Sequence, residues 1–277
     1  MLTITESTLQ ENTAAHGGAL DNSGSLTITE STLSGNSSLG KYGRGGAILN
    51  NGDLTIASSE LQQNAALDDG GAILNNGELT ITSSTLQENT AMDDGGAIEN
   101  LGELTITEST LIGNAGKWGG AIDNDEGVLT IIASTLTGNV GKWGGAIYND
   151  VGELAITESS LIENTANRDG GGIYNDVGEL TIAESSLIEN TANCDGGAIC
   201  NNHGELTITE TTLEENTAHN LGGAICVSIA KISVSDSTFT GNTAKHNCGA
   251  IYLYKSEYES ENCTFKDNKP DDVYEEK

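Results

Sequence analysis

The sequence predicts an all-β fold, a single-stranded right-handed parallel β-helix of about 10–11 coils with about 25 residues in each coil. Three observations predict it. A tetrapeptide, G-G-A-I, recurs at a nearly fixed period, a segment with alternating apolar and hydroxyl residues accompanies it, and no segment has apolar residues at helical spacing. A period in the twenties is typical of a solenoid, in which each repeat stacks only on its neighbours.

The tetrapeptide marks a corner of each coil. It begins at Gly45, Gly70, Gly95, Gly119, Gly144, Gly196 and Gly222, and variants begin at Gly17 (G-G-A-L), Gly170 (G-G-G-I) and Cys248 (C-G-A-I). The spacing between copies stays within 24 to 28 residues. Paired glycines are typical of positions that need a positive φ or a close backbone approach. We therefore interpret the glycines as a sharp corner between strands and not as a phosphate-binding loop.

The segment L-T-I-T that follows the corner is predicted to be a strand. In the copy around residues 206–209, Leu206 and Ile208 alternate with Thr207 and Thr209. This period of two places the apolar side chains on a buried face and the hydroxyls outside. The density of Thr, Gly, Asn and Ser disfavours a helix. Three short strands and three turns would complete one coil, and coils would stack at roughly 4.8 Å.

An Asn closes an L-x-x-N element in every copy of the repeat. The series is Asn12, Asn36, Asn64, Asn89, Asn114, Asn139, Asn164, Asn190, Asn216, Asn242 and Asn268. A turn that bends into the core leaves backbone groups away from water, and a stacked Asn can donate to and accept from the same Asn one coil away. We predict a structural Asn ladder, and a second ladder that runs from Asn22 to Asn201 and stops at Val227. A substrate-binding role for these amides is less favoured, because a buried turn explains every copy.

Composition limits the domain plan and the partners. The chain has 277 residues and a net charge of −30, from 41 acidic and 11 basic residues. We predict one β-helix domain over residues 1–268 and a polar tail over residues 269–277. The negative charge disfavours nucleic acid and anionic membranes as partners, and no apolar run approaches the roughly 20 residues of a transmembrane segment. Met1 leads directly into a strand pattern without a signal peptide, so we expect the chain to be a fragment of a larger protein or an internal start.

Aromatic residues gather in the middle coils. The motif G-K-W-G-G occurs twice and puts Trp118 and Trp143 at equivalent positions one coil apart, and Tyr148 and Tyr174 extend an outward aromatic row. These four residues are the candidate ligand-binding surface, since neighbouring Trp rings can stack on a sugar. The alternative is that the two Trp rings only cover each other, because paired aromatics gain from stacking without a ligand.

Cysteines and acidic residues predict no metal site and no cofactor. All five cysteines lie in the last third of the chain, without C-x-x-C spacing, and Cys200 and Cys226 occupy equivalent places in consecutive coils. That pair is a disulfide candidate. Stacked glutamates are interpreted as a solvated acidic surface, because no calcium-loop motif is present, and calcium binding is the alternative. The D-D-G-G turns at Asp68 and Asp69, and at Asp93 and Asp94, have the same interpretation. The glutamates are Glu153, Glu158, Glu163, Glu179, Glu184, Glu189, Glu205, Glu210 and Glu215.

The repeated tetrapeptides G-G-A-I and F-x-x-N resemble those of the polymorphic outer membrane protein repeat family, best known from chlamydial surface proteins. F-x-x-N is complete at Phe239–Asn242 and Phe265–Asn268, and Leu replaces Phe in the other copies. The resemblance implies a right-handed β-helix at the cell surface or outside the cell. It implies a role in adhesion, with a host or neighbouring-cell surface protein or glycan as the partner.

The function predicted from these observations is a non-enzymatic surface or secreted β-helix that acts as an adhesion or structural module, with no catalytic residue. One alternative is an ice-binding protein that uses the outward Thr-x-Thr pairs, which are complete in five coils but interrupted at Ala57, Ile132 and Ala155. Another is a polysaccharide-active enzyme of the pectate-lyase-like superfamily. The enzyme is disfavoured because the chain has two arginines, Arg44 and Arg168, and no evident pairing of histidine with carboxylate.

Overall fold

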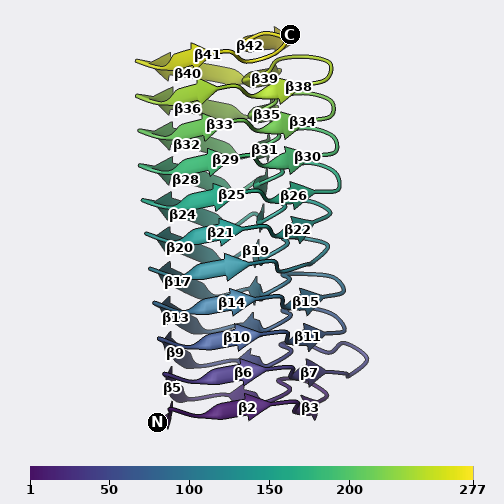
Figure 1. The fold of residues 1–277 in the computed structure, drawn as a ribbon, viewed down its shortest axis with the longest axis vertical. Helices are drawn as coiled ribbons and strands as arrows, with labels where there is room; N and C mark the ends of the chain where they lie inside the picture. The colour runs from purple at the N-terminus through teal and green to yellow at the C-terminus, as the bar shows by residue number, and fades with distance from the viewer. Residues whose placement is uncertain (277) are drawn as a thin grey trace.

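The computed structural model describes residues 1–276, which form a right-handed parallel β-helix. The chain winds into a rod of 11 coils, with its two termini at opposite ends (Figure 1). Three sheets of 11 strands each run the length of the rod, and no helix occurs within the described range. The predicted fold is confirmed. Lys277, the last residue of the predicted tail, lies outside the described residues.

The first sheet contains the L-T-I-T segments. Its strands are β1 (Leu2–Thr5), β5 (Ser25–Thr29), β9 (Asp53–Ala57), β13 (Glu78–Thr82), β17 (Glu103–Thr107), β20 (Val128–Ile132), β24 (Glu153–Thr157), β28 (Glu179–Ala183), β32 (Glu205–Thr209), β36 (Lys231–Ser235) and β40 (Glu257–Glu261). The second sheet follows it in each coil and contains the L-x-x-N segments. Its strands are β2 (Thr8–Gln10), β6 (Thr32–Ser34), β10 (Glu60–Gln62), β14 (Thr85–Gln87), β18 (Thr110–Ile112), β21 (Thr135–Thr137), β25 (Ser160–Ile162), β29 (Ser186–Ile188), β33 (Thr212–Glu214), β37 (Thr238–Thr240) and β41 (Thr264–Lys266).

The third sheet follows the Gly-Gly corner. Its strands are β4 (Leu20–Asn22), β8 (Ile48–Asn50), β12 (Ile73–Asn75), β16 (Ile98–Asn100), β19 (Ile122–Asp125), β23 (Ile147–Asp150), β27 (Ile173–Asp176), β31 (Ile199–Asn202), β35 (Ile225–Ser228), β39 (Ile251–Tyr254) and β42 (Val273–Glu276). Two-residue strands form two short ladders before the corner. They are β3 (Thr13–Ala14), β7 (Ser37–Ser38), β11 (Ala65–Ala66) and β15 (Thr90–Ala91), and then β22 (Val140–Gly141), β26 (Thr165–Ala166), β30 (Thr191–Ala192), β34 (Thr217–Ala218) and β38 (Thr243–Ala244).

The core consists of columns of identical side chains. Every strand pairs in parallel with its equivalents in the neighbouring coils, so that Leu180 lies beside Leu206 and Ile182 beside Ile208. These side chains are at most 1% exposed, whereas Thr207 between Leu206 and Ile208 points to solvent. Strand alternation thus sends the apolar residues inward, as predicted. Removing these Leu and Ile columns from water is the main favourable term in stacking the coils.

The Asn ladder satisfies the buried corner after the second sheet. Asn139 Nδ2 donates to Asn164 Oδ1 at 2.9 Å and to the Leu111 carbonyl at 3.0 Å. Its own Oδ1 accepts from the backbone and side-chain nitrogens of Asn114, both at 3.0 Å. The same pattern joins all members from Asn12 to Asn268. Each amide therefore bonds in both directions along the rod, and the predicted ladder is confirmed.

Two further ladders line the other turns. In the second Asn series, Asn50 Nδ2 donates to Asn75 Oδ1 at 2.7 Å, and equivalent bonds continue as far as Asn201, where the prediction ended the series. The third ladder was not predicted. It consists of Ser hydroxyls at the turn between the first and second sheets, where the Ser109 amide donates to Ser134 Oγ at 3.0 Å. All three turns of the coil therefore have stacked polar side chains that bond to the next coil.

The paired glycines are required by the corner. Gly144 has a φ of +64°. A methyl group on Gly145 would collide with the backbone carbonyl of Gly171 in the next coil. At the variant corner, Cys248 takes the position of the first glycine with a φ of +62°. The second glycine is therefore the stricter requirement, because it is fixed by contact between coils as well as by the bend.

The segment after Asn268 contributes to the rod. Residues Val273–Glu276 form β42, which pairs in parallel with β39 on the third sheet. The structure therefore extends the β-helix beyond residue 268, into the range for which the sequence predicted a polar tail.

Replacing one ladder amide should destabilise the rod. Asn139→Ala would leave two Asn114 N–H donors and the Leu111 carbonyl without partners in a buried corner. We expect a loss of about 2–4 kcal/mol in the free energy of unfolding, measured by urea denaturation. Thr80→Ala, on the exposed face of the first sheet, is the control and should change it by less than about 0.5 kcal/mol. Equal losses for the two variants would contradict the assignment of inward and outward faces.

A methyl group at the second glycine should be poorly tolerated. Gly145→Ala introduces a contact with the Gly171 carbonyl that only backbone movement can relieve. We expect a loss of about 1–3 kcal/mol or more in the free energy of unfolding. The matched variant is Gly24→Ala, whose methyl group meets nothing within 4 Å. If both variants melt at the temperature of the parent protein, close contact between coils does not explain the repeated Gly-Gly.

Candidate functional site

The third sheet has a row of side chains that point away from the core. We call it the outer row: Asp21, Leu49, Leu74, Glu99, Asp123, Tyr148, Tyr174, Cys200, Cys226, Tyr252 and Tyr274. In most of these strands an inward-facing Ile precedes the row residue and a ladder Asn follows it. Alternation along the strand therefore places the row on the outside of the coil wall.

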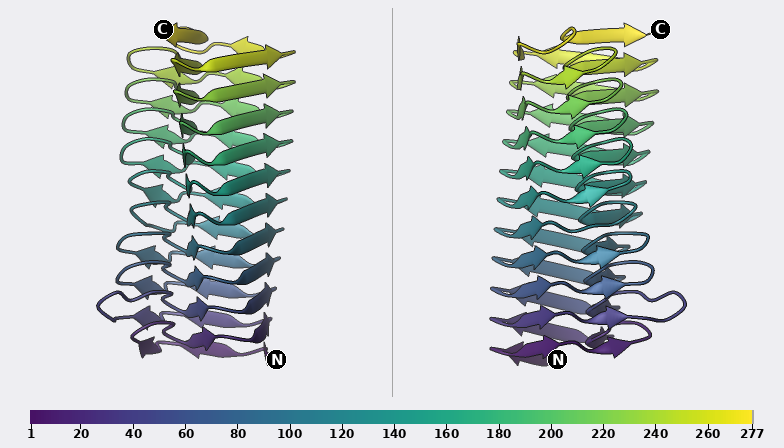
Figure 2. Two further views of the ribbon diagram at one scale, coloured as in Figure 1. Left: turned by 180° about the vertical axis from the view of Figure 1, so that it is seen from behind. Right: turned by 45° about the vertical axis from the view of Figure 1, so that its right-hand side comes forward.

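Loops cover much of the outer row. We call them the corner loops, and they precede each Gly-Gly corner at residues 67–69, 92–94, 116–118, 142–143, 167–169, 193–195 and 219–221. They stack along one edge of the rod (Figure 2). The loop at residues 39–44, which precedes the corner at Gly45, is longer than these and projects from the rod. Under them Leu74, Tyr148 and Cys226 are only 2%, 7% and 6% exposed. From Leu74 to Tyr252 the outer row therefore forms a second, largely buried layer outside the main core, whereas Asp21 and Tyr274 at its ends are exposed.

The chemistry of this layer changes along the rod. Acidic residues occupy the coils around Glu99, aromatic residues those around Tyr148, and thiols those around Cys200. The Leu, Ile and Asn columns, by contrast, repeat in nearly every coil. The repeated Leu, Ile and Asn positions are required for stacking. The outer-row positions differ from coil to coil, so their side chains can serve a function other than stacking. The candidate functional site is therefore this layer and its corner loops.

The structure brings the four predicted aromatic residues together. The rings of Trp118 and Trp143 stack with centroids 4.0 Å apart and planes 8° apart. Tyr148 meets Trp118 edge-on at 4.8 Å and stacks on Tyr174 at 5.4 Å. The sequence predicted an outward, exposed row, but Trp118 covers Tyr148, while both Trp rings stay half-buried. Burial raises the pKa values of Tyr148 and Tyr174, so both phenols are neutral at physiological pH.

Basic side chains surround the Trp pair. Lys142 Nζ lies 4.0 Å from the ring centroid of Trp143, and the Arg168 guanidinium carbon lies 5.6 Å from it. Lys117 Nζ lies 5.5 Å from the Trp118 ring. These contacts are within the range of cation–π attraction. Lys117, Lys142 and Arg168 are also the only basic residues between positions 45 and 230. We call these three residues and the two Trp residues the cationic aromatic corner.

The candidate disulfide is not formed. Cys200 and Cys226 lie in register on β31 and β35, as predicted, but both are buried free thiols. In-register neighbours follow the strand spacing of about 4.8 Å, which lies within the Cα separations that a disulfide can span, but the two sulfur atoms are not bonded. A hydrogen bond with the Cys226 thiol, together with burial, raises the pKa of Cys200 well above its usual value. Burial raises the pKa of Cys248 to about 12. The thiols of Cys200 and Cys248 are therefore packed in the layer in their unreactive protonated form.

A buried acidic cluster was missed by the sequence analysis. Glu99 and Asp123 lie in register on the outer row, and each is only 4% exposed. Asp69 and Asp94, the last residues of two corner loops, lie next to them. One carboxylate oxygen from each of Asp69, Asp94 and Glu99 falls within 4.8 Å of the others. The available signal was that Glu99 and Asp123 occupy a position filled by Leu, Tyr or Cys in most other coils.

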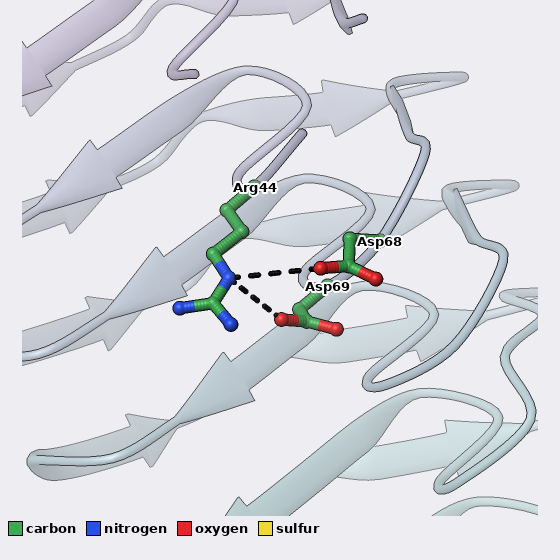
Figure 3. A network of polar contacts seen from close by, with 3 residues as sticks. All are labelled: Arg44, Asp68 and Asp69. Atoms are coloured by element: carbon green, nitrogen blue, oxygen red, sulfur yellow. Dashed lines mark ion pairs between the residues drawn. The ribbon is translucent and has the colours of Figure 1, made fainter. Parts of the chain in front are cut away.

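The basic residues near this cluster form ion pairs with aspartates at its edge. Arg44 Nε lies 2.9 Å from Asp69 Oδ2 and 3.9 Å from Asp68 Oδ2 (Figure 3). Lys117 Nζ lies 2.5 Å from Asp93 Oδ1. Within residues 1–276 neither Asp94, Glu99 nor Asp123 forms an ion pair with a basic side chain. The centre of the cluster is therefore negative wherever its carboxyls are ionised.

Burial shifts these carboxyls towards their protonated forms. Desolvation, and then the neighbouring Asp93 and Asp69, raise the pKa of Asp94 to about 7. Desolvation likewise raises the pKa values of Glu99 and Asp123 well above their usual values. Between the unfolded pKa of Asp94, near 3.8, and the folded value the native state binds more protons, so its stability falls as the pH rises. The cluster therefore destabilises the fold at neutral pH unless something compensates its charge.

The other predicted surfaces lie on different faces. The Thr pairs of the first sheet are in register in two separate blocks of two coils, between β1 and β5 and between β13 and β17. In the second block Thr80 lies beside Thr105 and Thr82 beside Thr107. Ala57 and Ile132 flank this block and interrupt the array. The stacked glutamates of the later coils are all exposed, at the ends of strands and at corners. No helix among the described residues is long and apolar enough to cross a membrane.

Comparisons with known proteins agree with this architecture. Residues 158–176, 184–202 and 210–228 match the model of the Chlamydia polymorphic membrane protein repeat. The crystal structure of PfbA, a surface adhesin of Streptococcus pneumoniae, is similar to the chain with a TM-score of 0.54 and 13% identity, over 93% of this chain and 72% of PfbA.

A second solved structure, a TibC-catalysed hyper-glycosylated fragment of TibA, aligns over 99% of this chain and 100% of the fragment. Its TM-score is 0.25 and its identity 13%. No curated protein matches the sequence. The three matched segments each run from the turn after a first-sheet strand, through the second sheet and the Gly-Gly corner, to the third-sheet strand of the same coil. The chain is thus a right-handed parallel β-helix in which three consecutive coils, at residues 158–228, contain segments similar to the Chlamydia polymorphic membrane protein repeat.

Proposed function

We propose that the chain is a non-enzymatic adhesion module, displayed at a cell surface or secreted, which presents a binding site on a rigid rod. The polymorphic membrane protein repeats support a surface location. The fold is compatible with the role, since it is shared with a protein described as a surface adhesin. Fold alone does not give function, so the proposal depends on a site.

The observation that carries the proposal is the cationic aromatic corner. The rod has a net charge of −30, and over nearly two thirds of its length its only basic residues surround Trp118 and Trp143. Trp and Arg are enriched among the residues that dominate binding energy at interfaces. The side chains also come from three consecutive coils, so the fold holds them at fixed spacing. A rigid aromatic surface loses little entropy when it binds.

The corner favours a partner with negative charge and an exposed apolar or sugar surface. A cell-surface glycan or protein of that kind could contact the exposed parts of the Trp rings and pair with Lys142 or Arg168. The ring faces are partly used, because Trp118 and Trp143 cover each other. Binding would therefore use the rim of the stack and its cations rather than a sugar inserted between the rings. The surrounding acidic surface would repel partners that do not fit this small region.

Removing the two Trp rings should weaken adhesion. For Trp118→Ala with Trp143→Ala we expect at least about a tenfold loss of attachment to host cells or to a glycan array, since two central aromatic anchors disappear. The melting temperature should fall modestly, because the main Leu and Ile core stays intact. Tyr42→Ala is the control, since Tyr42 is an exposed aromatic residue on the projecting loop, away from this corner.

The same assays test the alternatives. Attachment that survives the double Trp variant would remove the corner as the site. Thermal hysteresis of the parent protein would favour the ice-binding alternative, and release of sugars from a polysaccharide would favour the enzyme. A parent protein that binds no cell or glycan would contradict adhesion and leave the structural role.

A further inference from the structure

We propose that Asp94, Glu99 and Asp123, together with Asp69, bind one calcium ion beneath the corner loops. The site lies where the acidic part of the outer row meets the aromatic part. Its ligands come from three coils, two from corner loops and two from neighbouring strands of the third sheet. This proposal is independent of the adhesion site, although Trp118 borders both.

The geometry suits a single ion. Carboxylate oxygens of Asp69, Asp94 and Glu99 lie within 4.8 Å of one another. Ligands at 2.3–2.6 Å from a calcium ion can be separated by at most roughly 5 Å, so this spread matches one coordination sphere. Asp123 is the in-register neighbour of Glu99, and it lines a cavity of about 230 Å³ together with Asp94 and Trp118. That cavity can accommodate water ligands as well as the ion.

Unpartnered oxygen atoms point to a ligand. Within residues 1–276, four buried side-chain polar atoms have no hydrogen-bond partner, and three of them are Asp94 Oδ1, Glu99 Oε2 and Asp123 Oδ1. Glu99 and Asp123 are each 96% removed from solvent, given their exposure of 4%. A buried carboxylate oxygen without a partner is strongly unfavourable. An ion bound by Asp94 and Glu99 would give a partner to the oxygens of these two groups, and Asp123 lies beside Glu99 on the neighbouring strand.

Charge leads to the same conclusion. Arg44 pairs with Asp69, and Lys117 with Asp93, so the nearby basic side chains are engaged at the edge of the cluster. Within residues 1–276 no basic side chain forms an ion pair with Asp94, Glu99 or Asp123, so these buried carboxyls lack a counter-charge. A bound divalent cation would supply that counter-charge and favour their ionised forms.

The ligand set selects the kind of metal. All candidate ligands are carboxylate oxygens, which hard cations prefer and which thiol- or imidazole-seeking metals do not. Four acidic groups on a fixed backbone do not provide the regular octahedron that magnesium requires, whereas calcium accepts irregular coordination by six to eight oxygens. The sequence predicted no metal site because it lacks a local calcium loop. A site assembled from stacked coils has no local motif to find.

Binding can be measured on the full chain after treatment with a chelator. Terbium, which binds at oxygen-rich calcium sites, should emit when the tryptophans are excited, because Trp118 borders the cavity. Calcium should displace it, and calorimetry should give one tight calcium ion per chain at pH 7.5. Calcium should also raise the melting temperature, since only the folded chain assembles the site.

Variants distinguish calcium binding at the buried cluster from diffuse binding to the exposed acidic surface. Glu99→Gln and Asp123→Asn should each weaken calcium binding by at least about tenfold and abolish most of the terbium signal. Without calcium, both should melt at or above the parent temperature, because each removes a buried charge; this also checks that they fold. Glu103→Gln, at an exposed glutamate of β17, is the matched control and should bind as the parent does.

Three results would overturn the proposal. The first is a parent protein whose melting temperature and terbium emission do not respond to calcium, which would mean that protons alone neutralise the cluster. The second is equal weakening by Glu103→Gln and Glu99→Gln, which would mean diffuse binding to the acidic surface. The third is tighter binding of magnesium than of calcium.

Discussion

The hydrogen bonds of the Asn ladder constrain the rest of the rod. Each ladder amide donates to the Asn of one neighbouring coil and accepts from the Asn of the other, so an Asn must reach the same corner in every turn. This condition leaves few places for insertions. From the ladder Asn to the following Gly-Gly the distance is nine residues at Asn36 and five at Asn114. Most of the variation in coil length therefore lies in the corner loops, and the turn after the second Asn series varies by one residue.

The variable loops and the outer row together explain how a repetitive chain can carry specific chemistry. The core columns are fixed by stacking and offer no variety. The loops cover a second layer whose residues contact one another from coil to coil, so that a change in one coil affects mainly its neighbours. This arrangement produces successive acidic, aromatic and thiol regions along one edge. A function can then be built in three or four coils without disturbing the others.

The sequence was sufficient for the features that depend on period. The coil count, the core columns, both Asn ladders and the alignment of Trp118 with Trp143 follow from counting residues. It was insufficient where a loop folds over a strand. Alternation places the side chains of Tyr148 and Glu99 on the outer side of the third sheet. Whether these side chains are exposed to solvent depends on the path of the corner loop. The predicted disulfide between Cys200 and Cys226 is a similar case. Equivalent positions fix the register of the two residues but not the distance between their Cβ atoms.

The exposed glutamates have a consequence for how rods approach one another. Those at equivalent positions, such as Glu158, Glu184 and Glu210, recur once per coil, at about the 4.8 Å strand spacing. That interval is shorter than the screening length of about 8 Å at physiological salt, so each column acts as a continuous line of charge. Two parallel rods brought flank to flank would repel along their whole length. Copies crowded on one surface would therefore remain separated from one another. Their edges would stay exposed to solvent, and the rods would not associate through their flat sheets.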